Sequence, residues 1–200
     1  MDSKRITPWR LACLAGLASL WGMSELLGGP TLRVTATALL LLAIGRAILN
    51  LPGSSLAIAG VAVIFRAVNA APFYCHLAGV ALLGAAFDAM ATLLLRGEGR
   101  MLLRDALAGA ASALLSAASF AFAMVYVFRF RSWPQGGFGR VAEHTFYSGG
   151  RAALLALLVV PLGLLIGREL SRVAVRHSRP LLAAAAGAGA LLWLLGPFIG

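Results

Sequence analysis

The chain has little charge, few acidic residues and little cysteine. Only 12% of its 200 residues are charged and 60% are hydrophobic, whereas soluble domains run near a quarter charged and about half apolar. This composition excludes both an ordinary soluble domain and a disordered chain. The two cysteines, Cys13 and Cys75, lie in or beside apolar runs without framework spacing, which excludes a disulfide scaffold. We infer a protein that resides in a lipid bilayer.

The shortage of acidic residues leaves 17 basic residues against 7 acidic ones, a formal net charge of +10. Such a balance can indicate a nucleic-acid partner, which needs a basic stripe or tail with interleaved aromatics. Here the basic residues form short clusters between apolar segments, as charges that flank membrane spans do. We therefore expect membrane lipid as the partner and no nucleic acid.

Apolar runs suited to crossing a bilayer recur along the whole chain. About 20 apolar residues span a hydrocarbon core of about 30 Å. Seven candidate spans follow, at residues 9–27, 34–49, 55–70, 77–95, 106–128, 152–166 and 181–199. The second, third and sixth are short, so we expect them to extend into their flanks or to be covered at their ends by the protein. The sequence predicts an all-α, polytopic integral membrane helix bundle of six or seven transmembrane helices in one domain, residues 1–200.

The distribution of basic residues predicts the orientation, because cytoplasmic loops carry an excess of lysine and arginine. With the N-terminus inside, the cytoplasmic side collects Lys4, Arg5, Arg10, Arg46, Arg96, Arg100, Arg104, Arg168, Arg172, Arg176 and Arg179. The outer side then collects Arg33, Arg129, Arg131, Arg140 and Arg151. We expect a cytoplasmic N-terminus, an uncleaved first span and, with seven spans, an external C-terminus. If segment 181–199 lies on the membrane surface, there are six spans and both ends are inside.

Small residues four positions apart provide close-packing stripes, the usual source of helix association in lipid. Ala12 and Gly16 form such a stripe on the first span, and the fourth and fifth spans carry similar ones. The favoured interpretation is packing within the chain. The alternative is that the stripe of Ala12 and Gly16 docks a partner membrane subunit.

Ionisable residues at membrane depth are costly and are by default functional candidates. Arg66 and Asp88 each lie 11 residues into their spans, about 16 Å from the span start at helical rise. We predict that they form an ion pair near the midplane, which either fixes helix register or takes part in binding. Glu25 ends the first span near the outer interface, where it either binds a ligand or is a solvated helix end.

The outer loops contain the other candidate binding residues. Asn69 and His76 lie on either side of Pro72, and Cys75 with His76 alone does not make a metal site. The longest loop, 129–151, gathers aromatic, basic and glycine residues, including Trp133, Arg140, His144 and Tyr147. Its aromatics fit either an interfacial belt or a lid over a planar ligand, with Arg140 or His144 facing an anionic group.

Motifs for soluble enzyme chemistry are missing. The sequence has no phosphate-binding Gly-x-x-x-x-Gly-Lys, no His-Glu-x-x-His and no Gly-x-Ser-x-Gly. Asp88, Glu25 and His144 are able to act as acids or bases but show no catalytic spacing. We expect no catalytic residue, no metal and no cofactor, and any energised transport would need a separate ATPase subunit.

The first helix, with small residues four apart and the ending Trp-Gly-Met-Ser-Glu, resembles that of the S components, the substrate-binding membrane subunits of energy-coupling factor (ECF) transporters. The likeness is clearest over residues 11–96. In that family an Ala-x-x-x-Ala stripe on the first helix contacts the coupling subunit, and Ala12 and Gly16 hold the matching positions here. The family binds its ligand near the outer face, which implies binding roles for Glu25, Asn69, His76 and the region 133–147. A seventh helix departs from the family's usual six.

The resemblance implies a substrate-binding subunit for uptake of a small molecule, such as a vitamin or cofactor precursor, in the bacterial cytoplasmic (inner) membrane. Its partners would be a coupling membrane subunit and ATPase subunits. The alternative is a structural or assembly subunit of a membrane complex without a ligand. A membrane enzyme acting on a lipid or isoprenoid is the third hypothesis.

Overall fold

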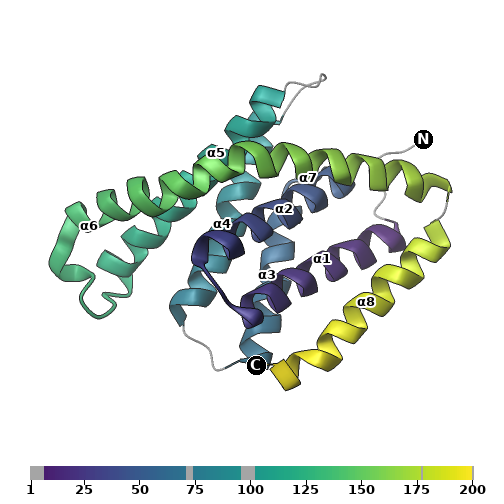
Figure 1. Cartoon of the computed structure of the whole chain (residues 1–200), viewed down its shortest axis with the longest axis horizontal. Helices are drawn as coiled ribbons and strands as arrows, with labels where there is room; N and C mark the ends of the chain where they lie inside the picture. The colour runs from purple at the N-terminus through teal and green to yellow at the C-terminus, as the bar shows by residue number, and fades with distance from the viewer. Residues whose placement is uncertain (1–6, 71–73, 96–101, 177, 200) are drawn as a thin grey trace.

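The computed structural model describes residues 7–70, 74–95, 102–176 and 178–199, and these residues form helices without a strand (Figure 1). This confirms the predicted all-α class. The α-helices are α1 (Pro8–Leu27), α2 (Thr31–Leu49), α3 (Ser54–Asn69), α4 (Tyr74–Leu94), α5 (Leu102–Phe122), α6 (Gly137–His144), α7 (Gly150–Arg176) and α8 (Ser178–Ile199). Between α5 and α7 lie the π-helix η1 (Ala123–Val127), the 3-10 helix η2 (Pro134–Gly136) and the π-helix η3 (Thr145–Gly149).

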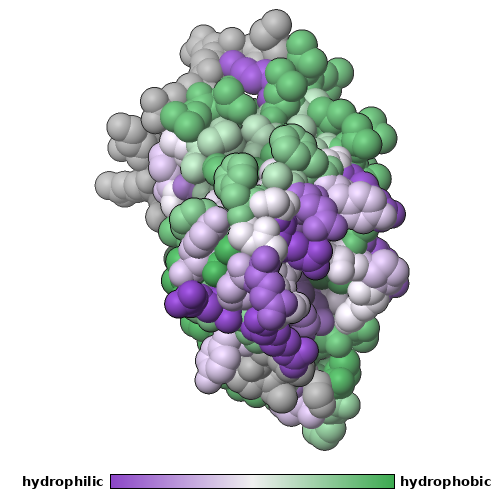
Figure 2. All heavy atoms as spheres, turned by 90° about the vertical axis from the view of Figure 1, so that its left-hand side faces the viewer, coloured by the Kyte–Doolittle hydropathy of each residue, from purple (hydrophilic) through white to green (hydrophobic). Residues whose placement is uncertain are grey.

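Five helical segments within the described residues are long and apolar enough to cross a membrane, so the chain is a multi-pass membrane protein. These segments are Thr31–Leu49, Tyr74–Leu94, Leu102–Val127, Pro134–Ala174 and Arg179–Ile199. The helix α1 is long enough to cross a membrane, but Arg10 and Glu25 lower its mean hydropathy, so it is not among these five segments. In Figure 2, hydrophilic residues gather at the centre of the end that carries α6, and hydrophobic residues surround them.

Each of the seven candidate spans coincides with a helix. The second and sixth extend into their flanks, to 19 and 27 residues. The third, α3, has only 16 residues, about 24 Å at helical rise. A helix of that length is shorter than the hydrocarbon core of about 30 Å, so every residue of α3 lies near one of its two ends.

The prediction of a long outer loop at 129–151 is wrong. Helix resumes at Pro134, and α6, η3 and α7 follow one another without a break, as the long helix across Figure 1 shows. Glycine and arginine lower the apolar signal of this segment, but tertiary packing stabilises the helix. Val141 of α6 is buried with Ala121 of α5 and Val125 of η1, and Trp133 packs against this cluster.

The central helix of the bundle, α2, packs chiefly against α7. Two glycines of α7 allow close backbone approach. A Cβ on Gly163 would lie 2.8 Å from the carbonyl oxygen of Leu40, and one on Gly167 would lie 2.5 Å from that of Ile44. Because lipid supplies little hydrophobic force between helices, such close contacts are a main source of their association.

The C-terminal helix α8 lies along α1 (Figure 1). Gly16 is buried there, and a Cβ on it would lie 3.4 Å from the carbonyl oxygen of Ala185. Trp193 of α8 donates a hydrogen bond from Nε1 to Oγ of Ser19, 3.1 Å away. The stripe that the sequence offered for partner docking is therefore covered at Gly16 by the chain's own α8, while Ala12 is half-buried.

Candidate functional site

A cavity of about 740 Å³ lies at the end of the bundle where α1, α3 and α5 end and α2, α4 and α7 begin. Its volume is within the range of about 300–1,000 Å³ typical of small-molecule sites. Its polar lining includes Glu25, Thr35, Arg66, His76, His144, Ser148 and Arg151, and its apolar and aromatic lining includes Trp21, Leu32, Val80, Leu83, Ala113 and Phe120.

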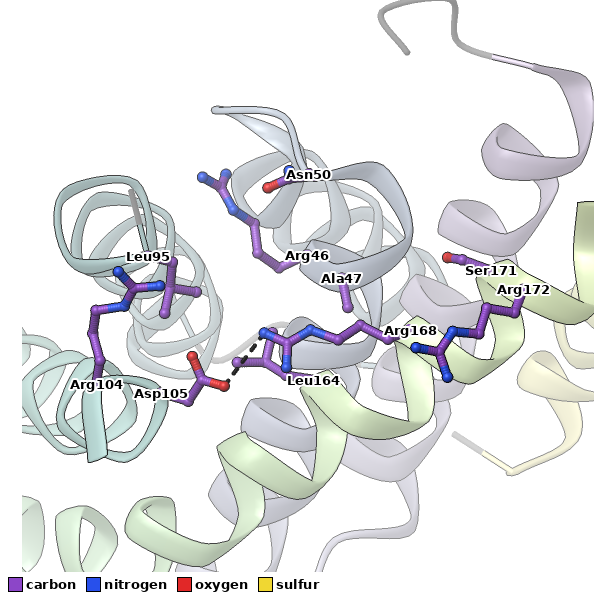
Figure 3. Close-up of a pocket in the computed structure, with 10 residues that line it drawn as sticks. All are labelled: Arg46, Ala47, Asn50, Leu95, Arg104, Asp105, Leu164, Arg168, Ser171 and Arg172. Atoms are coloured by element: carbon purple, nitrogen blue, oxygen red, sulfur yellow. Dashed lines mark hydrogen bonds and ion pairs between the residues drawn. The ribbon is translucent and has the colours of Figure 1, made fainter. Parts of the chain in front are cut away.

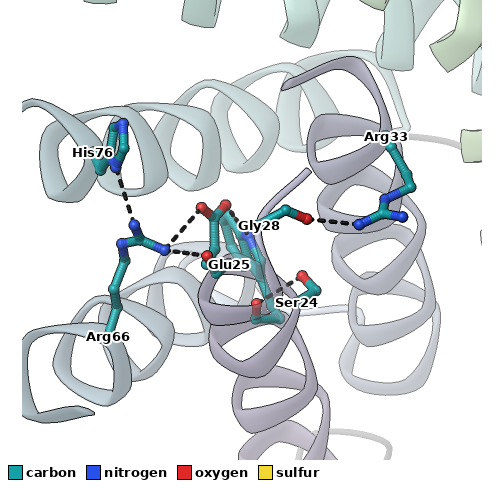
Figure 4. A network of polar contacts seen from close by, with 7 residues as sticks. Ser24, Glu25, Gly28, Arg33, Arg66 and His76 are labelled. Carbon is teal, nitrogen blue, oxygen red and sulfur yellow. Dashed lines mark hydrogen bonds and ion pairs between the residues drawn. The ribbon is translucent and has the colours of Figure 1, made fainter. Parts of the chain in front are cut away.

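One wall of the cavity is a polar network centred on Arg66 (Figure 4). Its guanidinium lies 3.6 Å from the carboxylate of Glu25 and also donates to the backbone carbonyl of Glu25. It donates as well to Nδ1 of His76, 3.0 Å away. Because a guanidinium only donates, Nδ1 of His76 accepts and its ring proton is on Nε2. Trp21 donates from Nε1 to the other side of the Glu25 carboxylate, at 3.1 Å.

Local sequence explains why Glu25 and Arg66 meet. The last carbonyls of a helix have no partner within the helix, and α1 ends at Leu27, so the carbonyl of Glu25 is open to the Arg66 guanidinium. The chain then turns at Gly28 and Gly29, whose φ angles of 63° and 115° favour glycine. Arg33 stabilises this turn by donating to the carbonyl of Gly28 at 2.6 Å.

Another part of the cavity wall is backed by an aromatic cluster of Phe120 on α5, Trp133 before η2 and His144 on α6. The ring of His144 lies 5.7 Å from that of Phe120 and 5.3 Å from that of Trp133. The guanidinium of Arg140 lies over Trp133 at 5.3 Å. His144 and Phe120 line the cavity, whereas Trp133 and Arg140 support His144 from outside it. The π-helix η3 follows at once and supplies Ser148, as π-helical turns often do at functional sites.

The structure brings four of the candidate binding residues together in the cavity lining: Glu25, Arg66, His76 and His144. The other five candidates do not line it. Asn69 is buried beside α8 and donates to the carbonyl of Phe65 at 2.7 Å. Tyr147 is exposed, and the guanidinium of Arg151 lies over its ring. Trp133 and Arg140 lie behind His144, outside the cavity lining. Asp88 lies at the opposite end of α3.

The predicted ion pair between Arg66 and Asp88 is wrong. Asp88 instead accepts hydrogen bonds from the backbone N–H groups of Gly53 at 2.8 Å and Ser55 at 3.1 Å, and lies 3.6 Å from Arg46. The prediction placed both residues near the midplane because each lies 11 residues into its candidate span. In a helix as short as α3, however, Arg66 is only three residues from the last residue, Asn69. The two residues therefore lie at opposite ends of antiparallel helices.

Several cavity residues were missed by reasoning from the sequence. Trp21 lies nearly two turns before the end of α1, and Thr35 lies one turn after the start of α2. Ser116 and Phe120 lie on α5 among small residues. Arg151 was assigned only a role in topology. Their shared signal was their position near one end of the bundle, because the ends of six helices converge there on one volume. Only the packing of those helices shows which faces look inward.

The cavity can bind and orient a ligand by hydrogen bonding and charge. Groups of three or more His, Cys, Asp or Glu able to hold a metal ion do not occur in the described part of the chain. Glu25 and His76 each contact Arg66, so this wall presents a charge-compensated network of a carboxylate, a guanidinium and an imidazole. Comparisons of the chain with protein-family models, with curated proteins and with solved structures found no match.

Proposed function

We propose that the protein is a non-catalytic, membrane-embedded substrate-binding subunit for uptake of a small molecule, of the type of the ECF transporter S components. The observation that supports this most is the cavity itself. Glu25, Arg66, His76 and His144 come from four different helices and line one volume of about 740 Å³. A bundle that served only as a structural spacer would not need to keep ionisable groups around such a volume, because their desolvation is costly.

The lining indicates the kind of ligand. One wall offers a carboxylate, a guanidinium and an imidazole, and another part of the lining offers the aromatic rings of Phe120 and His144. Val80, Leu83 and Ala113 make the deeper part apolar. This combination suits a small ligand with an apolar or planar body and a polar, hydrogen-bonding head, as in a vitamin or cofactor precursor.

For orientation, we propose a multi-pass protein of the bacterial inner membrane with a cytoplasmic N-terminus. This topology puts the cavity at the outer face, as uptake requires, and follows the excess of basic residues in the inner loops. With α8 as a seventh span, the C-terminus is external. A C-terminal reporter active only in the cytoplasm should therefore stay inactive; activity would reject the seven-span version.

Energy for uptake would come from a coupling membrane subunit and ATPase subunits. Since α8 covers Gly16, a coupling subunit must either contact α8 or displace it from α1. Docking at the stripe of Ala12 and Gly16 would thus require either a surface that includes α8 or a movement of α8 away from α1.

The test is to purify the full chain from its native membrane and to identify both its co-purified small molecules and its protein partners by mass spectrometry. The proposal expects a stoichiometric small molecule together with an ATPase-containing complex. A persistently empty chain in a complex without an ATPase would contradict it and favour a structural or assembly subunit. A bound lipid or isoprenoid that is chemically altered on incubation would instead favour a membrane enzyme.

A further inference from the structure

A second cavity, of about 630 Å³, lies at the opposite end of the bundle from the Glu25–Arg66 network. It is bounded by the end of α2, the end of α4, the start of α5 and the later turns of α7 (Figure 3). The helix α2 connects the two sites, because Thr31 and Thr35 line the first cavity and Arg46 and Asn50 line the second. We call this second cavity the arginine pocket.

Four arginines from three helices line the arginine pocket: Arg46, Arg104, Arg168 and Arg172. Asp105 is the one acidic residue among the described residues that line it. It is 3% exposed and lies 3.3 Å from Arg168, whose side chain is one-third exposed. The described lining therefore carries four guanidinium groups and one carboxylate, and the side chain of Arg168 is partly exposed.

The acidic partners outside the pocket reduce this excess only in part. Arg172 pairs with Glu169, but both side chains are more than half exposed, so solvent screens the pair. Asp88, the partner of Arg46, already accepts hydrogen bonds from two backbone N–H groups of the turn between α2 and α3. Arg46, Arg168 and Arg172 thus each have an acidic neighbour, and arginines still outnumber carboxylates among the described residues that line the pocket itself.

Arg46 is the most informative of the four arginines. It is 6% exposed, yet its Nε has no hydrogen-bond partner among the described residues. Its two terminal nitrogens donate to the carbonyl of Leu51 at 2.6 Å and to Oγ1 of Thr92 at 3.2 Å. Burying an arginine donor without a partner is costly, so the structure keeps the charge of Arg46 at this end of the bundle at some cost in stability.

We propose that the arginine pocket binds a phosphate group, either in the headgroup of an anionic phospholipid or as free phosphate. Guanidinium groups match tetrahedral oxyanions with paired N–H donors. Basic pockets between transmembrane helices near a membrane surface bind anionic lipid headgroups. This site does not depend on the proposed function of the first cavity, because the two share no lining residue.

The experiment uses the full chain and two probes. In nanodiscs containing equal amounts of phosphatidylglycerol and phosphatidylcholine, native mass spectrometry measures which lipid stays bound. In detergent, thermal unfolding is compared in inorganic phosphate and in chloride at matched ionic strength. Arg172→Gln is an exposed change that preserves the fold, and Arg168→Gln combined with Asp105→Asn avoids leaving a buried carboxylate alone. The matched control is Arg33→Gln, an exposed arginine at the other end of α2.

The wild-type chain and Arg33→Gln should both retain phosphatidylglycerol over phosphatidylcholine or be stabilised by phosphate. Arg172→Gln should weaken that binding about fivefold, since a basic side chain near a membrane surface contributes about 1 kcal/mol. The double variant leaves the net charge unchanged and should weaken binding through the loss of the Arg168 N–H donors. Retention of phosphatidylglycerol without stabilisation by phosphate identifies the lipid headgroup, and the reverse identifies free phosphate. The proposal is overturned if neither probe binds selectively, or if the pocket variants and Arg33→Gln behave alike.

Discussion

The guanidinium of Arg66 lies 3.6 Å from the carboxylate of Glu25, and the two side chains are only 12% and 17% exposed. The same guanidinium contacts His76 at the start of α4. One side chain of α3 therefore connects the end of α1 with the start of α4 on the wall of the first cavity. Removal of this arginine should affect both the stability of the bundle and the shape of the site.

Arg66→Gln should lower stability more than removal of an exposed arginine does, because it leaves Glu25 as a largely buried carboxylate without its cation. We expect a loss of about 3 kcal/mol, the lower end for breaking a buried pair. Adding Glu25→Gln should recover part of that loss. Thermal unfolding in detergent measures all three variants, with Arg33→Gln as the control. Equal losses in the single and double variants would show that the two side chains are not coupled.

Asp88→Asn should destabilise the turn between α2 and α3 without affecting a ligand in the first cavity. The change weakens the acceptors for the N–H groups of Gly53 and Ser55 and removes the partner charge of Arg46. We expect a cost of about 1–2 kcal/mol in thermal unfolding. Glu143→Gln, which breaks the exposed pair with Arg140, should cost less than about 1 kcal/mol. Loss of bound ligand in Asp88→Asn at unchanged stability would contradict this assignment.

The sequence was sufficient for the all-α class and for the positions of the seven candidate spans, because apolar run length sets helix position. Four of the nine candidate binding residues line the first cavity, and their role in binding stays a prediction. The side chains with which these residues interact were harder to predict. The pairing of Arg66 with Glu25 depends on the shortness of α3 and on the approach of α1 to α3. Counting residues along individual spans shows neither of these.

The helix through 137–149 shows a second limit. Its glycines, arginines and polar residues resemble a loop, and packing against α5, including the burial of Val141, stabilises it as helix. The small-residue stripes predicted from the sequence did not include Gly163 and Gly167, which bring α7 into close backbone contact with α2. That pair was visible as a four-residue spacing, but the sequence does not show which helix it meets.

Gly163→Leu should disrupt the contact between α2 and α7, because even a Cβ there would lie 2.8 Å from a backbone carbonyl oxygen. Backbone cannot shift as a flexible side chain can, so we expect at least about 3 kcal/mol of destabilisation or loss of folded protein in size-exclusion chromatography. The control is Gly60→Leu on α3, where an added Cβ meets nothing within 4 Å. Similar behaviour of the two variants would contradict the close approach of α7 to α2.

Gly16→Leu should separate packing of α8 from docking of a partner. Gly16 is buried beneath α8, whereas the neighbouring Ala15 is exposed on the same helix. If α8 is the occupant of this face, Gly16→Leu lowers the unfolding temperature and Ala15→Leu does not. Thermal unfolding and co-purification of partner subunits are measured side by side. A Gly16→Leu variant with unchanged stability that loses its partners would instead assign the stripe to docking.

The central claim is that the cavity beside Glu25 and Arg66 holds a small molecule, and native mass spectrometry of the chain purified from its own membrane tests it most directly. Gly79→Leu fills the cavity lining from α4, where an added Cβ meets only the Phe120 ring at 3.7 Å, and Gly60→Leu is the matched control. We predict one small molecule bound per chain in the wild type and in Gly60→Leu, and none in Gly79→Leu. A wild-type chain without a bound molecule, or a bound molecule that Gly79→Leu leaves in place, would contradict the account.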